Sequence, residues 1–385
     1  MRTAFFTVLG LSILLVVVYD VYATILHARG RSGPIGETLN RTIWRAARFA
    51  AFRFPRQRRH RLLNTVGPTL LPLLIIVFIA LLVLGFACVY YPRMPANFNA
   101  ESAAAAAETP WMTSLYFSGI TLTTVGYGDI APRTAGMRLT AMLESASGFA
   151  LISLAITYLI TVYRALERKR AVALSFYHQA EEGANVAAFI AHHFVGDRFY
   201  SLPTTMRMAT RDIQELLESH VEHPVIHYFH PPEVYKSLPR MLFLSLEVCA
   251  VIRSCLDEGE YAETVNHPEV RTLEASSRHV LHALLASLEL ERRSRRRRRE
   301  TPFEESRRWR QRFEQTLGQL EKVGIKTRAD VEAAWEFYRA RREEWEAQLH
   351  RFSLHLGYDW DEITGDRDLR YAADEEMEEP GEIEG

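Results

Sequence analysis

Cysteine is scarce in this chain of 385 residues, which contains only Cys88, Cys249 and Cys255. No disulfide framework and no cysteine spacing of a zinc site is visible. Alternating strand patterns are also missing, as are a strand followed by G-x-G-x-x-G and an EF-hand calcium loop. These absences argue against a dinucleotide-binding regulatory domain and a β-rich cyclic-nucleotide domain, and no motif supports an enzyme.

Charge is missing from one long stretch of the chain. Residues 62–163 carry only seven charged side chains, whereas the whole chain has 46 basic and 47 acidic residues. A purely soluble protein is therefore excluded, and the net charge of −1 only averages a basic middle and an acidic end. The seven are Arg93, Glu101, Glu108, Asp129, Arg133, Arg138 and Glu144.

Three stretches are long and apolar enough to cross a membrane as helices. Residues 62–92 have no charge, and residues 139–163 have only Glu144. Residues 3–19 are uncharged, and this stretch extends to Leu26 if one aspartate is accepted. A cleaved signal peptide is the alternative for the first stretch, but no clean small-residue cleavage site precedes the arginines, which favours a signal-anchor helix.

The orientation follows from the arginines in the short connections. Residues 29–61 hold ten arginines and one acidic residue, and residues 164–170 are again basic. Residues 93–136 hold only two basic residues, Arg93 and Arg133, with three acidic residues. This distribution predicts a multi-pass protein of the cell membrane with its N-terminus outside and its C-terminal half in the cytoplasm.

The basic segment itself has a helical pattern. Ile43, Ala47, Ala50 and Phe54 repeat at helical spacing, and Pro55 stops the run. Such a helix suits either the inner leaflet, with arginines near anionic lipids, or packing on the soluble domain.

Between the last two apolar stretches lies a segment too short to cross the membrane. Thr109 suits a helix cap and Pro110 suits the first helical position. Residues 110–122 are therefore predicted to form a helix of 13 residues, about 20 Å long. Such a helix can end inside the bilayer only where protein or water surrounds its end. Its C-terminal carbonyl groups carry partial negative charge and favour a cation there.

The residues after this helix alternate glycine with side-chain-bearing positions. Glycine reaches positive φ at little cost, so successive carbonyl oxygens can point to one side and replace the hydration shell of K⁺. Residues 123–129 resemble the signature of tetrameric potassium channels at every position, and residues 68–163 resemble the two-helix pore of that family. The resemblance implies that four chains assemble, because this chain has one filter, and that K⁺ binds at Thr124, Val125, Gly126 and Tyr127. The whole filter is Thr124, Val125, Gly126, Tyr127 and Gly128.

The same resemblance assigns supporting roles beside the filter. Asp129 lies at the outer mouth, and Tyr116 occupies the position of an aromatic donor that often bonds to this aspartate in the family. A hydrogen bond between Tyr116 and Asp129 is the resulting hypothesis. Ile120 stands where some bacterial relatives carry a glutamate, so no carboxyl pair is expected behind the filter.

The resemblance also places the gate. Gly148 lies 20 residues after Gly128, where many relatives have a hinge glycine in the inner helix. A hinge is one reading of Gly148, and close packing against a neighbouring helix is the other. Ile152, Ile156 and Ile160 are predicted to line the cavity and the inner gate.

Two carboxylates within the apolar stretches need partners, because charge is costly in a membrane. Glu144 is expected either to approach the pore helix and respond to pH, or to be a structural carboxyl bonded to Ser118 or Thr121. Asp20 is expected to pair with an arginine of residues 29–61.

Helical patterns continue through the C-terminal half, beginning with a continuation of the inner helix over residues 164–182. Residues 237–256 predict a helix with one long apolar face. Thr327 and Asp330 have the spacing of a capping box and predict a helix that ends near Gly357. The apolar positions of this last helix are Val331, Trp335, Tyr338 and Trp345.

Three further patterns leave alternatives open. The histidines at 220–230 are spaced three, four and three residues apart and suit metal or proton sensing, or ordinary surface and packing roles. Residues 292–299 contain seven arginines and suit anionic lipid, nucleic acid or a solvated linker. Residues 373–385 are acidic and are predicted to be disordered. The histidines are His220, His223, His227 and His230.

The sequence as a whole predicts an all-α membrane protein with three transmembrane helices, a re-entrant pore helix and an all-α cytoplasmic domain. The predicted function is passive, K⁺-selective conduction by a homotetramer, with K⁺ as the permeant ion, no cofactor, an unknown ligand for the cytoplasmic domain and no nucleic acid partner. The alternatives are a membrane signalling or scaffold protein and a weakly selective cation channel. The predicted parts are a transmembrane helix (1–28), a basic linker (29–65), the pore module (66–165), the helical domain (166–372) and the acidic tail (373–385).

Overall fold

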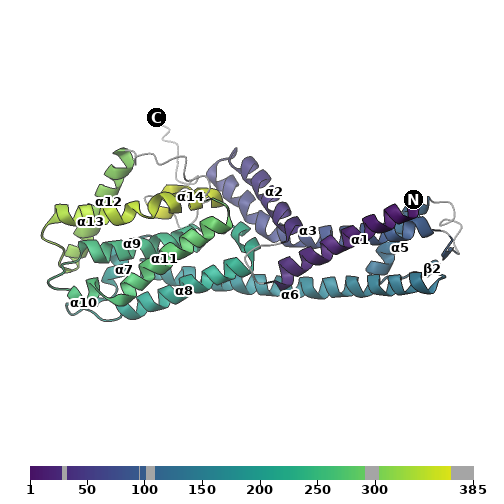
Figure 1. The fold of residues 1–385 in the computed structure, drawn as a ribbon. Helices are drawn as coiled ribbons and strands as arrows, with labels where there is room; N and C mark the ends of the chain where they lie inside the picture. The colour runs from purple at the N-terminus through teal and green to yellow at the C-terminus, as the bar shows by residue number, and fades with distance from the viewer. Residues whose placement is uncertain (28–32, 95, 101–108, 291–302, 366–385) are drawn as a thin grey trace, which may run out of the picture. The chain divides into compact units, whose positions relative to one another are not determined.

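The described part of the chain consists of helices with two short β pairs (Figure 1). The computed structural model describes residues 1–27, 33–94, 96–100, 109–290 and 303–365. The all-α membrane-protein class predicted from the sequence is confirmed. The chain divides into two compact units, one of Met1–Ile43 with Pro68–Tyr163 and one of Trp44–Gly67 with Arg164–Gly385.

Three helices of the described residues are long and apolar enough to cross a membrane. They coincide with the three apolar stretches of the sequence, but two of them extend further. α3 begins directly after Pro55, and α6 continues to Gln179, which confirms the predicted continuation of the inner helix. At 1.5 Å per residue the 45 residues of α6 reach about 67 Å. The three are α1 (Arg2–Val21) with the π-helical turn Tyr22–Leu26, α3 (Arg56–Tyr90) and α6 (Ala135–Gln179).

α1 contacts α3 through two glycines. A Cβ on Gly10 would lie 2.5 Å from the carbonyl oxygen of Gly85, and a Cβ on Gly85 would lie 2.8 Å from Cδ2 of Leu14. The first distance, to a backbone atom, leaves no room for a larger residue, and the second would require the Leu14 side chain to move. Small residues at such contacts let transmembrane helices approach closely, so these glycines attach the first predicted transmembrane helix to the pore unit.

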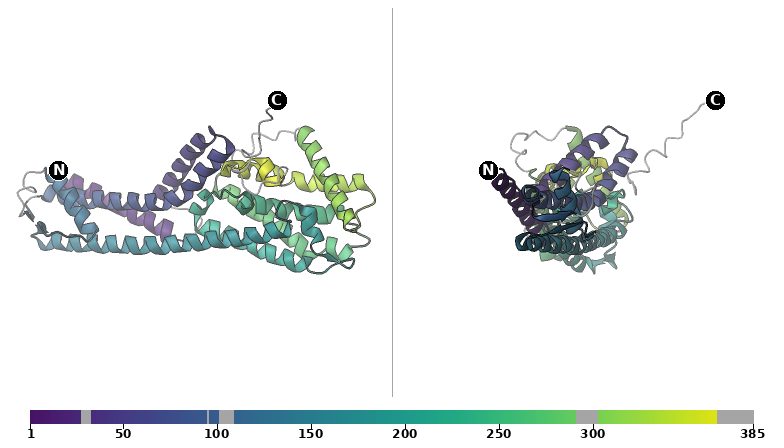
Figure 2. Two further views of the ribbon diagram at one scale, coloured as in Figure 1. Left: turned by 180° about the vertical axis from the view of Figure 1, so that it is seen from behind. Right: turned by 90° about the vertical axis from the view of Figure 1, so that its right-hand side faces the viewer.

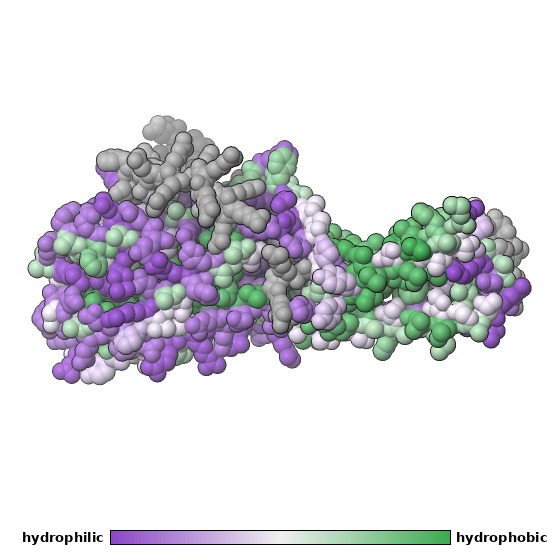
Figure 3. All heavy atoms as spheres, viewed as in Figure 1, coloured by the Kyte–Doolittle hydropathy of each residue, from purple (hydrophilic) through white to green (hydrophobic). Residues whose placement is uncertain are grey.

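The core of the first unit is a stripe of apolar side chains on α3. These side chains recur every four residues and are all buried, as expected for one face of a helix. They pack with Phe117 of the pore helix and Leu151 of α6. The outward surface of this unit is also largely apolar (Figure 3), as expected for helices that face lipid. The stripe consists of Leu74, Phe78, Leu82, Phe86 and Tyr90.

The second unit is a helical domain built around α9 (Leu238–Cys255), shown from two sides in Figure 2. Seventeen of its 18 residues are buried, because α7, α11 and α13 pack against it. The other elements are α7 (Val186–Ala191), β3 (Phe194–Val195), β4 (Arg198–Phe199), α8 (Leu202–Glu222), α10 (Ala262–Val265), α11 (Pro268–Ser287), α12 (Phe303–Lys322), α13 (Val331–Glu343), α14 (Glu346–Leu356) and α15 (Trp360–Thr364).

Two predictions for this domain need correction. The helix predicted over residues 237–256 is confirmed as α9, but it is buried all round rather than on one face. The predicted capping box at Thr327 is wrong: the Asp330 side chain caps α13 by accepting from the amide of Ala333 at 3.0 Å. The helix predicted to end near Gly357 is two helices, α13 and α14, although Gly357 does end the second with φ of 92°.

α2 (Pro34–Ala51) buries a face shifted by one position from the predicted one. Trp44 is 2% exposed and packs on Tyr228, with ring centroids 5.6 Å apart, and both residues belong to the second unit. The large indole side chain of Trp44 determines which face of α2 is buried. Of the predicted face, Ile43 and Ala47 are half-buried and Phe54 is exposed. The Trp44–Tyr228 contact supports the prediction that part of this helix packs on the soluble domain.

Candidate functional site

The predicted pore helix, α5, is short and lies directly before residues 124–128, the predicted filter. It covers Pro110–Leu122 with 13 residues, as predicted. The Thr109 hydroxyl oxygen accepts from the amide of Met112 at 3.5 Å, and Pro110 occupies the first position, where no amide hydrogen is needed. A helix of this length cannot cross a bilayer, so its carbonyl end stops inside the unit.

The filter backbone alternates the sign of φ. Thr124, Gly126 and Gly128 have φ of 60°, 55° and 83°, while Val125 and Tyr127 stay outside the positive region. Such alternation turns successive carbonyl oxygens toward the same side. Glycine adopts this geometry freely, but a β-branched threonine at positive φ is strained, and such strain is concentrated at functional sites. The sequence predicted the glycines and missed the strain at Thr124.

Hydrogen bonds hold both ends of the filter. At the pore-helix end, the Gly126 amide donates to the Ile120 carbonyl at 3.2 Å. At the other end, β2 (Ile130–Pro132) follows the filter and pairs antiparallel with β1 (Phe98–Ala100). The filter is therefore a short segment fixed between a helix end and a β pair.

The hydrogen bond predicted between Tyr116 and Asp129 is present. The Tyr116 hydroxyl donates to Oδ2 of Asp129 at 3.0 Å. Oδ1 of Asp129 is buried and has no hydrogen-bond partner among the described residues. Ile120 is buried behind the filter, so the position contributes apolar packing and no carboxylate.

Glu144 lies behind the pore helix and is fully buried. The Tyr90 hydroxyl donates to its Oε2 at 2.7 Å, and the Ser118 hydroxyl contacts its Oε1. The structural reading of Glu144 predicted Ser118 as a partner, which is confirmed, whereas Tyr90 was missed. One carboxylate thereby connects the three helices α3, α5 and α6.

Gly148 on α6 faces the end of the pore helix. A Cβ at this position would collide with the carbonyl oxygen of Leu122, the last residue of α5. The packing reading of Gly148 is therefore confirmed, and α6 runs through this position without a break. Its use as a hinge stays a prediction.

The predicted pore-lining residues share one exposed face of α6. Ile152, Ile156 and Ile160 are 47%, 56% and 49% exposed in the single chain. Leu151 and Ala155 on the same helix are buried within the unit. The isoleucines are thus available for contacts outside their own chain.

Asp20 caps another helix. Its carboxylate oxygens accept from the amides of Ile35 at 2.5 Å and Gly36 at 3.3 Å, in the first turn of α2. Negative charge is favourable at this helix end. Pairing of Asp20 with an arginine of residues 29–61 stays a prediction, because Arg29 and Arg31 of that segment lie outside the described residues.

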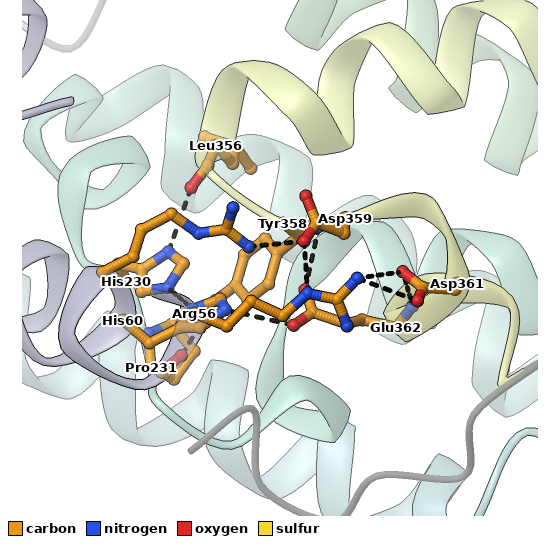
Figure 4. A network of polar contacts seen from close by, with 10 residues as sticks. Arg56, His60, His230, Pro231, Leu356, Tyr358, Asp359, Asp361 and Glu362 are labelled. Atoms are coloured by element: carbon orange, nitrogen blue, oxygen red, sulfur yellow. Dashed lines mark hydrogen bonds and ion pairs between the residues drawn. The ribbon is translucent and has the colours of Figure 1, made fainter. Parts of the chain in front are cut away.

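A cluster of opposite charges joins the first turn of α3 to α15 within the second unit (Figure 4). The Arg56 guanidinium lies 2.7 Å from an oxygen of Asp359 and 2.9 Å from one of Asp361, and Arg59 donates to Asp359 at 2.6 Å. Sequence analysis did not pair these residues. We call the set the clasp; its members are Arg56, Arg59, His60, Asp359, Asp361 and Glu362.

Hydrogen-bond contacts continue from the clasp to His230. Nδ1 of His230 lies 3.0 Å from the Leu356 carbonyl, which can only accept. Nε2 of His230 lies 2.6 Å from Nδ1 of His60, and Nε2 of His60 lies 3.1 Å from Oε1 of Glu362. His60 and Glu362 are both fully buried, so each depends on these partners for its hydrogen bonds.

The four spaced histidines are buried rather than on the surface. The rings of His220 and His227 lie 5.0 Å apart. Burial lowers the pKa of His220 to about 3 and keeps the pKa of His227 well below its usual value, so both are neutral near pH 7. No group of three or more His, Cys, Asp or Glu in the described ranges is arranged to hold a metal ion. Residues 292–299 and 373–385 lie outside those ranges.

Comparison with known proteins identifies the pore segment. Residues 76–165 match the family model described as ion channel. This segment is similar to an ion-channel pore. It includes the last 15 residues of α3, the whole of α5, residues 124–128 and α6 up to residue 165.

One relative is similar over more of the chain. It is the uncharacterized membrane protein YdjJ of Bacillus subtilis (strain 168), 26% identical over 232 residues. The match covers 60% of this chain and 65% of the relative, which is less than two thirds of its length. No solved structure matches the chain.

Proposed function

We propose that this chain is the subunit of a homotetrameric channel that conducts K⁺ passively and selectively across the cell membrane. The observation that carries the proposal is the alternating φ at residues 124–128, directly after a helix too short to cross the bilayer. Backbone carbonyls arranged in this way can replace the water around K⁺. The ion-channel match over residues 76–165 supports a pore in this segment.

Assembly of four chains is supported by what the single chain leaves uncovered. The side chains of Val125 and Tyr127 are 53% and 72% exposed. One filter strand cannot surround an ion, so rings of oxygens require neighbouring copies. Four copies around an axis would cover these residues and the exposed isoleucines of α6.

The proposed orientation has the N-terminus outside and the C-terminal domain in the cytoplasm. The exposed end of α2 supports contact of the arginine-rich segment with anionic lipid. Phe49 is 66% exposed, and the Arg53 guanidinium lies 4.0 Å from its ring centre. Aromatic rings beside arginines suit the boundary between headgroups and acyl chains.

The proposal is tested by reconstituting the purified chain into vesicles and measuring K⁺ and Na⁺ flux separately. We expect K⁺ flux to exceed Na⁺ flux, and Gly126→Ala to abolish selective flux because position 126 needs positive φ. Gly119→Ala is the matched control, since its Cβ would meet nothing within 4 Å and its φ is ordinary. Equal fluxes would favour a weakly selective cation channel, and absence of both fluxes would favour a signalling or scaffold protein.

A further inference from the structure

A polar cavity of about 570 Å³ lies within the second unit. Its lining comes from the segment before α7 and from α9, α12 and α15. The volume is within the range of sites for nucleotide- or drug-sized ligands, about 300–1,000 Å³. Most such sites are apolar, whereas charged and amide side chains dominate this one, so its ligand must be strongly polar.

One wall of the cavity is a row of donors on α12. Arg308 and Arg312 are four residues apart, and Gln315 and Gln319 continue the row at spacings of three and four residues. Arg312 is half-buried, whereas Arg308, Gln315 and Gln319 are exposed, so Arg312 is the most enclosed donor of the row. Guanidinium groups offer paired donors whose geometry matches the oxygens of a phosphate group.

Glu247 on α9 lines the same cavity and is 1% exposed. Its Oε1 is occupied by the Tyr338 hydroxyl and by the Arg342 guanidinium at 2.9 Å. Its Oε2 has no hydrogen-bond partner in the described part of the chain. A buried carboxylate oxygen without a donor is unfavourable, and a ligand N–H would satisfy it.

We propose that this cavity binds a small organic phosphate that also carries an amino or imino group. The phosphate binds Arg308 and Arg312, and the N–H group donates to Oε2 of Glu247. Inorganic phosphate fills only part of such a volume and offers no N–H group to Glu247. A ligand without an N–H group leaves the Glu247 oxygen unsatisfied, so both groups are required on one molecule.

This inference rests on the proposed channel function and adds to it a class of ligand that would regulate the channel. Asp361, Thr364 and Gly365 of the α15 region line the cavity, and Asp361 is also paired with Arg56 in the clasp. Arg56 is the first residue of α3, the helix that continues into the pore unit. A bound ligand therefore contacts the element that holds the cytoplasmic start of this helix.

Calorimetric titration of the full-length chain in detergent tests the proposal with two pairs of probes. Glucosamine 6-phosphate is compared with glucose 6-phosphate, and adenosine monophosphate with ribose 5-phosphate. We expect the nitrogen-bearing member of at least one pair to bind about tenfold more tightly than its partner, as for one added charge-assisted hydrogen bond. Absence of binding by both nitrogen-bearing phosphates at millimolar concentration overturns the proposal.

Two neighbouring arginines provide the variant and its control. Arg308→Ala should weaken binding about tenfold by removing a phosphate contact. Arg307→Ala should leave binding unchanged, because Arg307 is equally exposed but does not line the cavity. Equal affinities of the two variants would also overturn the proposal. Ligand binding without K⁺ flux in vesicles would support the ligand site and contradict the channel function. K⁺ flux without ligand binding would support the channel function and contradict the ligand site.

Discussion

At the scale of the residue, Glu144 shows how a carboxylate is accommodated among apolar helices. Its two oxygens contact the hydroxyls of Tyr90 and Ser118, which come from two other helices. Sequence analysis could predict Ser118, because the pore helix was located by its own motif. It could not predict Tyr90, because that contact depends on how α3 and α6 are aligned after folding.

Tyr90→Phe should destabilise the folded protein. The change removes one of two donors to a fully buried carboxylate, which costs about 1–3 kcal/mol. Thermal unfolding in detergent measures the effect. Tyr19→Phe is the control, since Tyr19 is 58% exposed, and equal melting temperatures of the two variants would contradict the role given to Tyr90.

The buried histidines predict a loss of stability in acid. The pKa of His220 is about 3 in the folded chain and 6.5 is its ordinary value, so the unfolded chain binds more protons between these pH values. Stability should fall as the pH drops below about 6.5, by up to about 1.4 kcal/mol per pH unit for this residue.

Denaturant unfolding at several pH values between neutral and acid tests this prediction. His220→Gln should flatten the dependence, because the amide does not titrate. His279→Gln should leave it unchanged, since His279 is exposed on α11. An unaltered slope in His220→Gln would show that other groups cause the acid sensitivity.

At the scale of the element, prediction succeeded where helix ends are set locally. Thr109 and Pro110 fixed the start of α5, and its observed bounds equal the predicted ones. The predicted cap of α13 was wrong because Thr327 has a competing partner. The Thr327 hydroxyl donates to Glu321 at 2.8 Å, and the Asp330 side chain caps the helix instead. Local spacing cannot indicate such a competitor from a different helix.

Gly148→Ala should reduce the amount of correctly folded protein. The added Cβ would displace the Leu122 carbonyl at the end of α5, directly before the filter. Gly136→Ala on the same helix is the control, because its Cβ would meet nothing within 4 Å. Size-exclusion profiles distinguish the readings: normal assembly of Gly148→Ala with altered open probability would favour a hinge over packing.

The clasp predicts a second effect at this scale. Arg59→Gln should destabilise the second unit by about 3 kcal/mol, because Asp359 loses a largely buried ionic partner. Arg58→Gln, at an exposed neighbouring position, should change stability by less than about 0.5 kcal/mol. Thermal unfolding measures both, and similar shifts would argue that the ion pairs contribute little.

At the scale of the whole molecule, the sequence predicted the fold class, the three long apolar helices and the short helix α5, because each depends on a contiguous segment. The clasp joins residues about 300 positions apart, such as Arg59 and Asp359, so no local pattern could reveal it. The division into units is a similar case. Residues 44–67 belong with the helical domain, although their composition suggested a separate linker.

The proposed assembly predicts a mass of four chains of 44.2 kDa each. Four copies are needed because each chain supplies one filter strand. Native mass spectrometry from mild detergent measures the assembly directly. A predominant monomer or dimer that still conducts K⁺ would contradict the fourfold arrangement.

The length of α6 has a mechanical consequence. Between Phe149 and Gln179 the helix contains neither glycine nor proline, so this part has no joint at which motion could be absorbed. Under the proposed channel function, a stimulus sensed by the helical domain would therefore reach Ile160 along one continuous helix.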